Sequence, residues 1–169
     1  MLVRSVLAEC GRMGAKTTMF DGPALAALPH FNPERPERTE EEAAFVAALR
    51  EADGLVIGTP GYHGGVSGVV KNAIDLLEDL RGDERIYFDG MPVGLIVSAA
   101  GMAGGRRHAG ALRGIVHAMR GWPTPAGIAI NSIAQKPFDG EGTIIDEGVA
   151  AQIATQAQQI MAFRLEPVA

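Results

Sequence analysis

The stretch Gly54–Leu80, GLVIGTPGYHGGVSGVVKNAIDLLEDL, predicts the fold of this chain. It opens with the apolar run Leu55–Ile57, whose length and β-branched content are typical of a buried parallel strand. A loop of small residues with one aromatic ring follows at 59–65, and the pattern from Ser67 onward is that of an amphipathic helix. A strand, a glycine-rich turn and a helix in this order form the unit that places a ligand at the carboxyl end of a parallel sheet.

The rest of the chain repeats this alternation of strands and helices. We expect strands at 16–20, 54–59, 92–98 and 125–131, and helices at 2–10, 39–52, 67–81, 106–120 and 146–163. Thr39 and Glu42 have the spacing of a capping box, in front of an inward face of Ala43, Phe45, Val46 and Leu49. Segment 22–38 carries four prolines and is predicted to cross the surface without a core element. The alternation predicts an α/β fold of three layers, with a doubly wound, flavodoxin-like parallel sheet, as a single domain over residues 1–169.

The beginning of this pattern is unusual, because a helix comes before any strand. In the strand order 2-1-3-4-5 of such a sheet, the first strand is central and joins the second strand to the rest. We therefore expect that the first strand is missing from this sequence and that the domain is incomplete at its N-terminus, which a start assigned too late would explain. A rearranged sheet, or a partner that supplies the missing edge, is the alternative.

Composition narrows the classes of partner. The net charge is −5 and there is no basic stripe to neutralise phosphates, which argues against nucleic acid. No apolar run approaches the ~20 residues of a membrane span, and no signal-peptide pattern is present at the start. The single cysteine, Cys10, cannot form an internal disulfide and is predicted to be a core residue. We expect a cytoplasmic protein with neither nucleic-acid nor membrane partners.

Two small-residue segments, 59–66 and 98–105, follow predicted strands at their carboxyl ends. Both are built largely from glycine and alanine, so that backbone N–H groups can approach a planar ligand without an intervening Cβ. Tyr62 is the one ring in the first segment and can border a heterocycle. Ser67 is placed to cap the helix that follows. The pattern indicates a ligand site at this edge of the sheet.

The run Thr59–Asp75, TPGYHGGVSGVVKNAID, resembles the signature of the NADPH-dependent FMN reductase family. That signature has a Pro-x-Tyr loop, a serine–glycine step into a helix, and Lys-Asn-Ala-x-Asp within the helix. The run from Val97 through Gly101 to Gly121–Pro123 is also similar in order and spacing. The resemblance implies a flavodoxin-like fold, FMN as cofactor, NADPH or NADH as hydride donor, a small-molecule electron acceptor, and a homodimer or homotetramer.

The resemblance also implies roles for individual residues. The residues that would wrap one side of the flavin ring are Thr59, Pro60, Gly61, Tyr62, His63 and Gly64. Those that would border its other side are Ser98, Ala99, Ala100 and Gly101. Tyr62 and His63 would line the open face on which nicotinamide and then the acceptor stack. No side chain is needed as an acid or base, because the hydride chemistry belongs to the flavin.

Two features depart from the family pattern. The family holds the FMN phosphate with a Gly-x-x-Arg-x-x-Ser loop after its first strand, and this sequence has no such loop. Position 61 is glycine where many members carry an acidic residue. We therefore expect weak flavin binding. Arg106 and Arg107 are either contacts for the NADPH 2′-phosphate or the solvated start of a helix.

Two alternatives to a reductase remain open. One is a flavodoxin-type electron carrier that does no nicotinamide chemistry, and the other is a non-catalytic interaction protein that has lost its flavin. The histidines (His30, His63, His108 and His117) lack the i, i+4 spacing and carboxylate partner of a metal site, so no metal is expected. Trp122 is predicted to be a packing residue.

Overall fold

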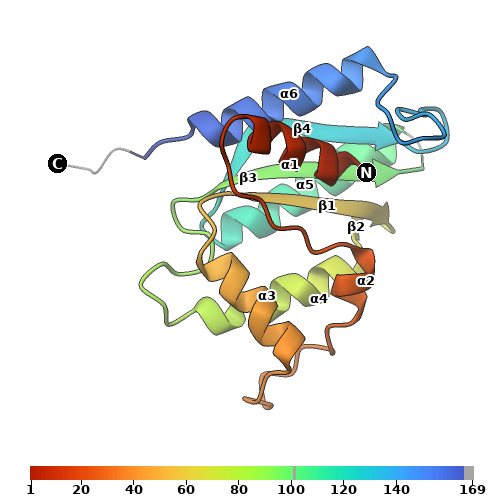
Figure 1. The fold of residues 1–169 in the computed structure, drawn as a ribbon. Helices are drawn as coiled ribbons and strands as arrows, with labels where there is room; N and C mark the ends of the chain where they lie inside the picture. The colour runs from red at the N-terminus through yellow and green to blue at the C-terminus, as the bar shows by residue number, and fades with distance from the viewer. Residues whose placement is uncertain (101, 166–169) are drawn as a thin grey trace.

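The computed structural model describes residues 1–100 and 102–165, with the side chains of all of these except 102–107. In chain order the elements are α1 (Leu2–Arg12), α2 (Gly22–Ala26), α3 (Glu40–Arg50), β1 (Leu55–Tyr62), β2 (Gly65–Val66), α4 (Gly68–Leu76), the 3-10 helix η1 (Leu77–Leu80), β3 (Pro92–Ala99), α5 (Met102–Ala118), β4 (Trp122–Asn131) and α6 (Glu147–Ala162). The strands of the sheet run across the molecule with their carboxyl ends at one side, and the N-terminus lies at that same side (Figure 1).

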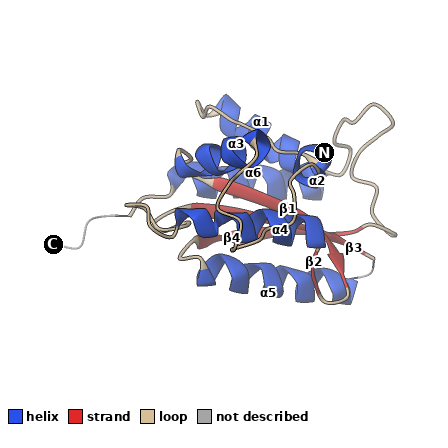
Figure 2. Cartoon of the chain, turned by 90° about the horizontal axis from the view of Figure 1, so that it is seen from below, coloured by secondary structure: helices blue, strands red, loops and turns tan. Residues whose placement is uncertain are grey.

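The sheet has the order β2-β1-β3-β4. β1, β3 and β4 are parallel, whereas β2 is a two-residue return that pairs antiparallel with the end of β1. Helices cover both faces, with α5 on one side of the strands and α1 and α6 on the other (Figure 2). This arrangement confirms the predicted three-layered α/β fold.

β3 shows why helices cover both faces of the sheet. Its side chains alternate between two apolar clusters: Val93, Leu95 and Val97 pack with α3, α4, η1 and α5, whereas Ile96 packs with α1 and α6. All of β3 except half-buried Ser98 is buried, as expected for the central strand of a parallel sheet. Along the described chain, no helix is long and apolar enough to cross a membrane.

The predicted strand at 16–20 is wrong. These residues are irregular, and no described strand pairs with them. A strand needs a neighbour that takes up its backbone N–H and C=O groups, and on its side away from β3, β1 pairs only with β2, at Gly61 and Tyr62. The segment is held by side-chain packing instead: Phe20 meets Phe45 edge-on, with the ring centroids 5.0 Å apart.

The proline-rich segment 22–38 is more ordered than predicted. It opens with α2, whose first N–H groups are capped by Asp21 through a hydrogen bond from Ala24 N to Oδ1 (3.2 Å). Proline at the start of this helix suits its missing N–H. Leu28 is buried in the larger apolar cluster, so the segment contributes to the core.

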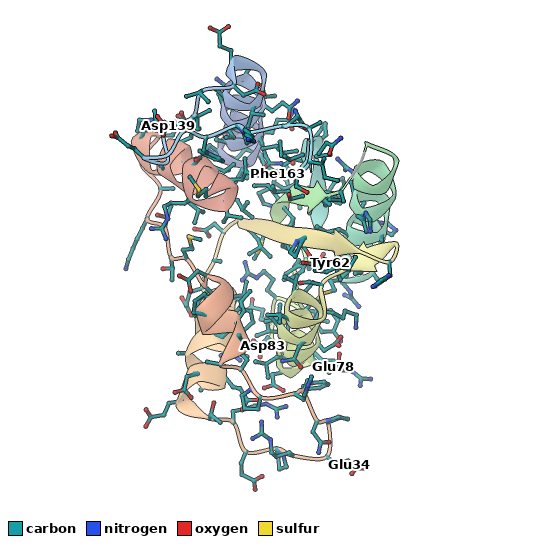
Figure 3. The ribbon with its side chains drawn as sticks, turned by 90° about the vertical axis from the view of Figure 1, so that its right-hand side faces the viewer. Glu34, Tyr62, Glu78, Asp83, Asp139 and Phe163 are labelled. Carbon is teal, nitrogen blue, oxygen red and sulfur yellow. The ribbon has the colours of Figure 1, made fainter. Side chains whose placement is uncertain are left out.

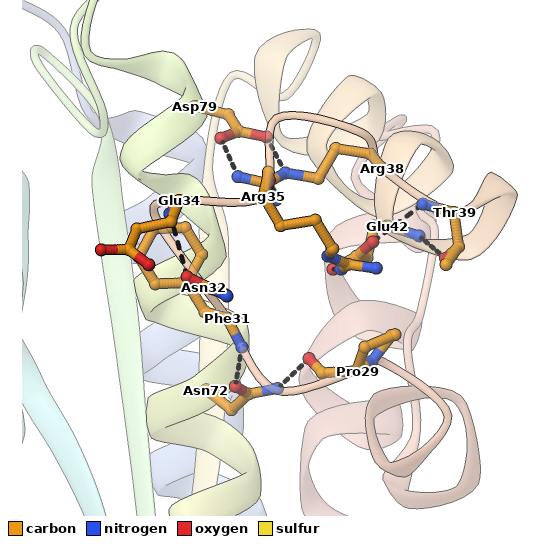
Figure 4. Close-up of polar contacts among 10 residues, drawn as sticks. All are labelled: Pro29, Phe31, Asn32, Glu34, Arg35, Arg38, Thr39, Glu42, Asn72 and Asp79. Atoms are coloured by element: carbon orange, nitrogen blue, oxygen red, sulfur yellow. Dashed lines mark hydrogen bonds and ion pairs between the residues drawn. The ribbon is translucent and has the colours of Figure 1, made fainter.

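The capping box at the start of α3 is confirmed. Thr39 Oγ1 accepts from Glu42 N, and the Glu42 carboxylate accepts from Thr39 N (Figure 4). The predicted inward face is correct except at Ala43, which is exposed, while Glu42 is fully buried. Glu42 tolerates burial because Arg35 donates a hydrogen bond to it at 2.6 Å.

β4 begins at Trp122, three residues before its predicted start, and its first half is irregular. Pro123 and Pro125 have no N–H to donate, and the ladder to β3 shifts register between Val93 and Leu95. Trp122 is half exposed and lies 5.9 Å, centroid to centroid, from Phe163.

Side chains from both neighbouring helices complete the hydrogen bonding of this irregular part. Gln156 Nε2 donates to the carbonyls of Leu95 and Ala126, Gln159 Oε1 accepts from Ala126 N, and Arg113 donates to Thr124 O.

The remaining helices match the predictions with shifted ends. Asp146 caps α6 through a hydrogen bond from Val149 N (3.0 Å). α5 begins at Met102, four residues before its predicted start, so part of the predicted loop 98–105 is helical. Cys10 is buried between α1 and α6, and this burial raises the pKa of its thiol, so it is the predicted core residue.

Candidate functional site

The carboxyl ends of β1 and β3 bring the two predicted loops together. The strands are parallel and in register, with Thr59 opposite Val97 and Pro60 opposite Ser98. Neighbouring parallel strands end at one edge of the sheet, so the segments that follow Pro60 and Ser98 lie next to each other. Figure 3 faces this edge.

The first segment is a hairpin rather than the predicted loop. β1 continues to Tyr62, the chain turns at His63 and Gly64, and β2 returns so that Gly61 pairs with Val66. His63 has φ 50° and Gly64 has φ 87°. Two consecutive positive φ angles are what a type I′ turn requires, and this turn suits a two-residue hairpin. The backbone of this segment therefore has the geometry of a tight β-hairpin.

Thr59 has a structural role at the base of the hairpin. It is 4% exposed, and its Oγ1 donates to Pro60 O (2.8 Å) and accepts from Ser67 N (3.0 Å). Ser67 in turn caps α4, as predicted, with Oγ accepting from Val70 N at 3.3 Å. Thr59 therefore ties the hairpin to the start of α4, and its hydroxyl is not directed at the solvent side of the site.

The tip of the hairpin is the accessible part. Pro60, Tyr62, His63 and Gly64 are exposed, and Tyr62 is 60% exposed, which is high for a tyrosine. Figure 3 shows Tyr62 at the hairpin, at this edge of the sheet. A side chain this exposed makes little contribution to the core, so it is available to a ligand.

The second segment is only partly described. Ser98 is half-buried, Ala99 is buried with its carbonyl accepting from Ser132 N (3.0 Å), and Ala100 is exposed. The predicted contact at Gly101 lies outside the described residues, as do the side chains of Arg106 and Arg107. Ala100 is thus the residue of this segment that the structure places at the surface.

A residue that the sequence left without a role joins the hairpin to α5, the helix that follows the second segment. His108 of α5 is 6% exposed, and its Nε2 accepts a hydrogen bond from Gly64 N at 3.0 Å. A Cβ on Gly61 would lie 2.6 Å from Cγ of the same imidazole. The feature of the sequence that relates to this contact is the glycine at position 61. Its partner His108 lies 47 positions later and is identified only from the fold.

The backbone at the tip of the hairpin is unobstructed beside Gly64. A Cβ added at Gly64 would meet nothing within 4 Å, so this backbone is open to a flat ligand. The sequence offers no Gly-x-x-Arg-x-x-Ser loop for a phosphate group. A solvent-open hollow of about 540 Å³ lies elsewhere, along the outer edge of β4, where Arg113 and Gln152 are its polar members.

The parallel sheet, with helices on both faces and two loop segments at the carboxyl ends of its strands, defines the class of this protein as a flavodoxin-like α/β protein. The model of one family, NADPH-dependent FMN reductase, matches residues 1–135. The chain belongs to the NADPH-dependent FMN reductase family.

Among its relatives is the FMN-dependent NADPH-azoreductase of Staphylococcus aureus, 35% identical over 113 residues, which are 66% of this chain and 56% of that protein. The chain thus spans just over half the length of the curated relatives it matches.

Solved structures share the fold. The flavoenzyme NAD(P)H:(acceptor) oxidoreductase (FerB) of Paracoccus denitrificans has a TM-score of 0.75 at 19% identity, over 95% of this chain and 88% of that one. The flavodoxin, WrbA-like protein of Agrobacterium tumefaciens has a TM-score of 0.55 at 17% identity, over 95% and 85%.

Proposed function

We propose that this chain is an NAD(P)H-dependent flavin oxidoreductase that binds FMN, accepts hydride from NADPH or NADH, and passes electrons to a small-molecule acceptor. The observation that carries the proposal is the register of β1 and β3, in which Pro60 lies opposite Ser98. It puts a glycine-rich hairpin and an alanine-rich segment side by side at the ligand edge of a flavodoxin-like sheet. Membership of the family and the azoreductase relative support it.

FMN, when bound, supplies the hydride chemistry, and the protein supplies position. In this proposal the backbone of Pro60, Gly61 and Gly64 contacts one side of the ring, and the segment Ser98–Gly101 borders the other. Tyr62 and His63 line the face on which the nicotinamide and then the acceptor stack. Thr59 acts indirectly, since its hydroxyl bonds hold the hairpin against α4.

The visible absorption spectrum of the purified protein with FMN, recorded before and after anaerobic addition of NADPH, tests the proposal. A flavin band that stays with the protein and bleaches on addition of NADPH supports it. A bound flavin that NADPH cannot bleach points to a flavodoxin-type electron carrier. Because weak binding is expected, FMN is titrated in large excess over the protein, and no spectral sign of binding even then points to a non-catalytic interaction protein.

Two further measurements sharpen this test. Riboflavin carries the same ring without the phosphate, so its affinity reports the ring contacts alone. An azo dye, suggested by the name of the S. aureus relative, and a quinone then serve as trial acceptors for the reduced protein.

We also propose that the protein forms a homodimer or homotetramer in the cytoplasm. The outer surface of α4 offers a candidate contact, since Val69 is 42% exposed beside the ion pair of Lys71 and Asp75. The buried free thiol of Cys10 suits a reducing compartment. Light scattering tests the assembly, and a monomer mass would contradict it.

A further inference from the structure

His108 makes a contact that reaches across the sheet edge. It lies on α5, and the hydrogen bond from Gly64 N to its Nε2 joins residues 44 positions apart. Since Nε2 accepts, the imidazole carries a lone pair on that atom, and its proton is on Nδ1. The ring is neutral in this arrangement.

The same ring also packs against Gly61. A Cβ built on Gly61 would come within 2.6 to 2.9 Å of three ring atoms, Cγ, Nδ1 and Cδ2. Real Cβ atoms essentially never approach other atoms so closely, so the ring and any side chain at position 61 exclude each other. The imidazole of His108 can occupy this position only because residue 61 has no side chain.

The two contacts lie on either side of the hairpin tip. Gly61 precedes Tyr62 and His63, and Gly64 follows them. His63 itself is held at φ 50°, a conformation that side-chain-bearing residues rarely adopt. The imidazole therefore fixes both ends of the short segment that carries Tyr62.

We expect global folding not to depend on this hydrogen bond. Gly64 is exposed, so its N–H can be satisfied by water if the imidazole leaves. The hydrogen bond from Gly64 N to His108 instead keeps the tip of the hairpin in one defined conformation. A phenylalanine at 108 would fill a similar volume but offer no acceptor.

We propose that His108 is a positioning residue for the ligand edge: its neutral imidazole, bonded to Gly64 and packed on Gly61, holds Tyr62 and His63 where a flavin ring binds. It thereby couples α5, which follows the second segment, to the hairpin that forms the first. This inference rests on the proposed flavin site.

Two substitutions of His108 distinguish the loss of the hydrogen-bond acceptor from a change in side-chain volume. In His108→Gln, the amide oxygen falls near the position of Nε2 and keeps the acceptor, whereas His108→Phe keeps a ring and loses it. We expect riboflavin and FMN affinity to weaken about tenfold in His108→Phe and to stay within about threefold of the wild type in His108→Gln. Equal affinities in both variants and the wild type would overturn the proposal.

Peptide-level hydrogen exchange over residues 59–66 provides a readout without any ligand. The exchange rate should rise in His108→Phe and stay near the wild-type rate in His108→Gln, while the thermal unfolding midpoints of the two variants remain similar. If exchange of this peptide is unchanged in His108→Phe, the imidazole does not order the hairpin and the inference fails. A variant that fails to fold is recognised by its unfolding curve, and the next pair of substitutions then decides.

The packing on Gly61 is tested by a second, independent pair. Gly61→Ala introduces the excluded Cβ and should increase exchange at 59–66, and adding His108→Ala removes the ring that it meets. His108→Ala by itself loses the hydrogen bond from Gly64 N and should also raise exchange. We therefore expect Gly61→Ala to increase exchange at this peptide much less in the His108→Ala background than in the wild type. Strictly additive effects would show that the two residues do not interact.

The readouts also separate this inference from the proposed function. If the wild-type protein binds neither riboflavin nor FMN, the flavin proposal fails, and hydrogen exchange alone decides whether His108 orders the hairpin. If flavin binds but both His108 variants bind it normally, the proposed function stands and the role of His108 is refuted.

Discussion

The side-chain amide of Asn72 hydrogen-bonds both to the backbone N–H of Phe31 and to the carbonyl of Pro29. Its Oδ1 accepts from the backbone N–H of Phe31 at 2.8 Å, and its Nδ2 donates to the carbonyl of Pro29 at 2.9 Å (Figure 4). α4, which starts at the ligand edge, is thereby tied to the proline-rich segment 22–38. Asparagine at position 72 has a structural reason in this fold, since a carboxylate could not make both bonds.

Substitution of Asn72 should therefore destabilise the protein. We expect Asn72→Ala to lower the free energy of unfolding by about 2 kcal/mol, because two hydrogen bonds of about 1 kcal/mol each are lost. Asn72→Asp keeps the acceptor for Phe31 but places a carboxylate against the Pro29 carbonyl, and should cost at least as much. Urea unfolding measures both variants, and a loss below about 0.5 kcal/mol in each would contradict the role given to this amide.

The paired groups Arg38 and Asp79 predict a pH dependence. Both Nε and Nη2 of Arg38 donate to the Asp79 carboxylate, at 2.7 and 2.8 Å (Figure 4). The hydrogen bonds from Arg38 lower the pKa of Asp79. A carboxyl whose pKa is lower in the folded state stabilises the fold above its unfolded pKa of about 3.9, and this stability is lost as the pH falls through the folded value.

Asp79→Asn should thus be less stable than the wild type by about 1 kcal/mol at pH 7, and the difference should shrink below about pH 4. Arg38 also bonds the Arg35 carbonyl, so a double-mutant cycle with Arg38→Met isolates the pair. A gap between wild type and Asp79→Asn that is the same at pH 7 and pH 3 would rule out this ion pair as its cause.

The stability of the protein should depend strongly on the side chain of Gln156. It is fully buried, its Nε2 donates to Leu95 O and Ala126 O, and its Oε1 has no hydrogen-bond partner in the described part of the chain. Gln156→Glu removes both donors and buries a charge among carbonyls. We expect a loss of about 3 kcal/mol or more in unfolding free energy at pH 7.

Acid should partly rescue Gln156→Glu. Burial favours the protonated carboxyl and so raises its folded-state pKa, which means that the folded protein is relatively most stable below the unfolded pKa and loses stability as the pH rises through the folded value. Unfolding curves of the variant and the wild type at pH 5 and pH 7 test this. A deficit that does not shrink at the lower pH would contradict it.

Tyr62 should matter for ligand binding and not for stability. Since it is 60% exposed, Tyr62→Ala is expected to change the unfolding free energy by less than about 0.5 kcal/mol. Riboflavin affinity should fall several-fold, because an aromatic contact of about 1 kcal/mol is lost. Ile145→Ala, which truncates another exposed apolar side chain, serves as the matched control. Equal riboflavin affinity in Tyr62→Ala and the control would remove Tyr62 from the site.

Local patterns in the sequence determined much of this protein. Ser67 and Thr39 cap the helices they were expected to cap, because a cap needs only a side-chain oxygen a few residues from a free N–H. The buried central strand was equally predictable from its continuous apolar run.

Contacts between distant residues were decided only by the tertiary structure. Residues 16–20 have strand-like side chains but form no strand, because none of the described strands offers them a partner. Glu42 is buried because Arg35 hydrogen-bonds to it. Gln156 is buried because the irregular pairing of β3 with β4 leaves the carbonyls of Leu95 and Ala126 for it to bond. The ligand edge shows the same division: the sequence marked the glycine at position 61, but only the fold placed His108 against it. Spacing along the chain determines which groups meet within a helix or strand, whereas hydrogen bonds across the sheet depend on register and packing.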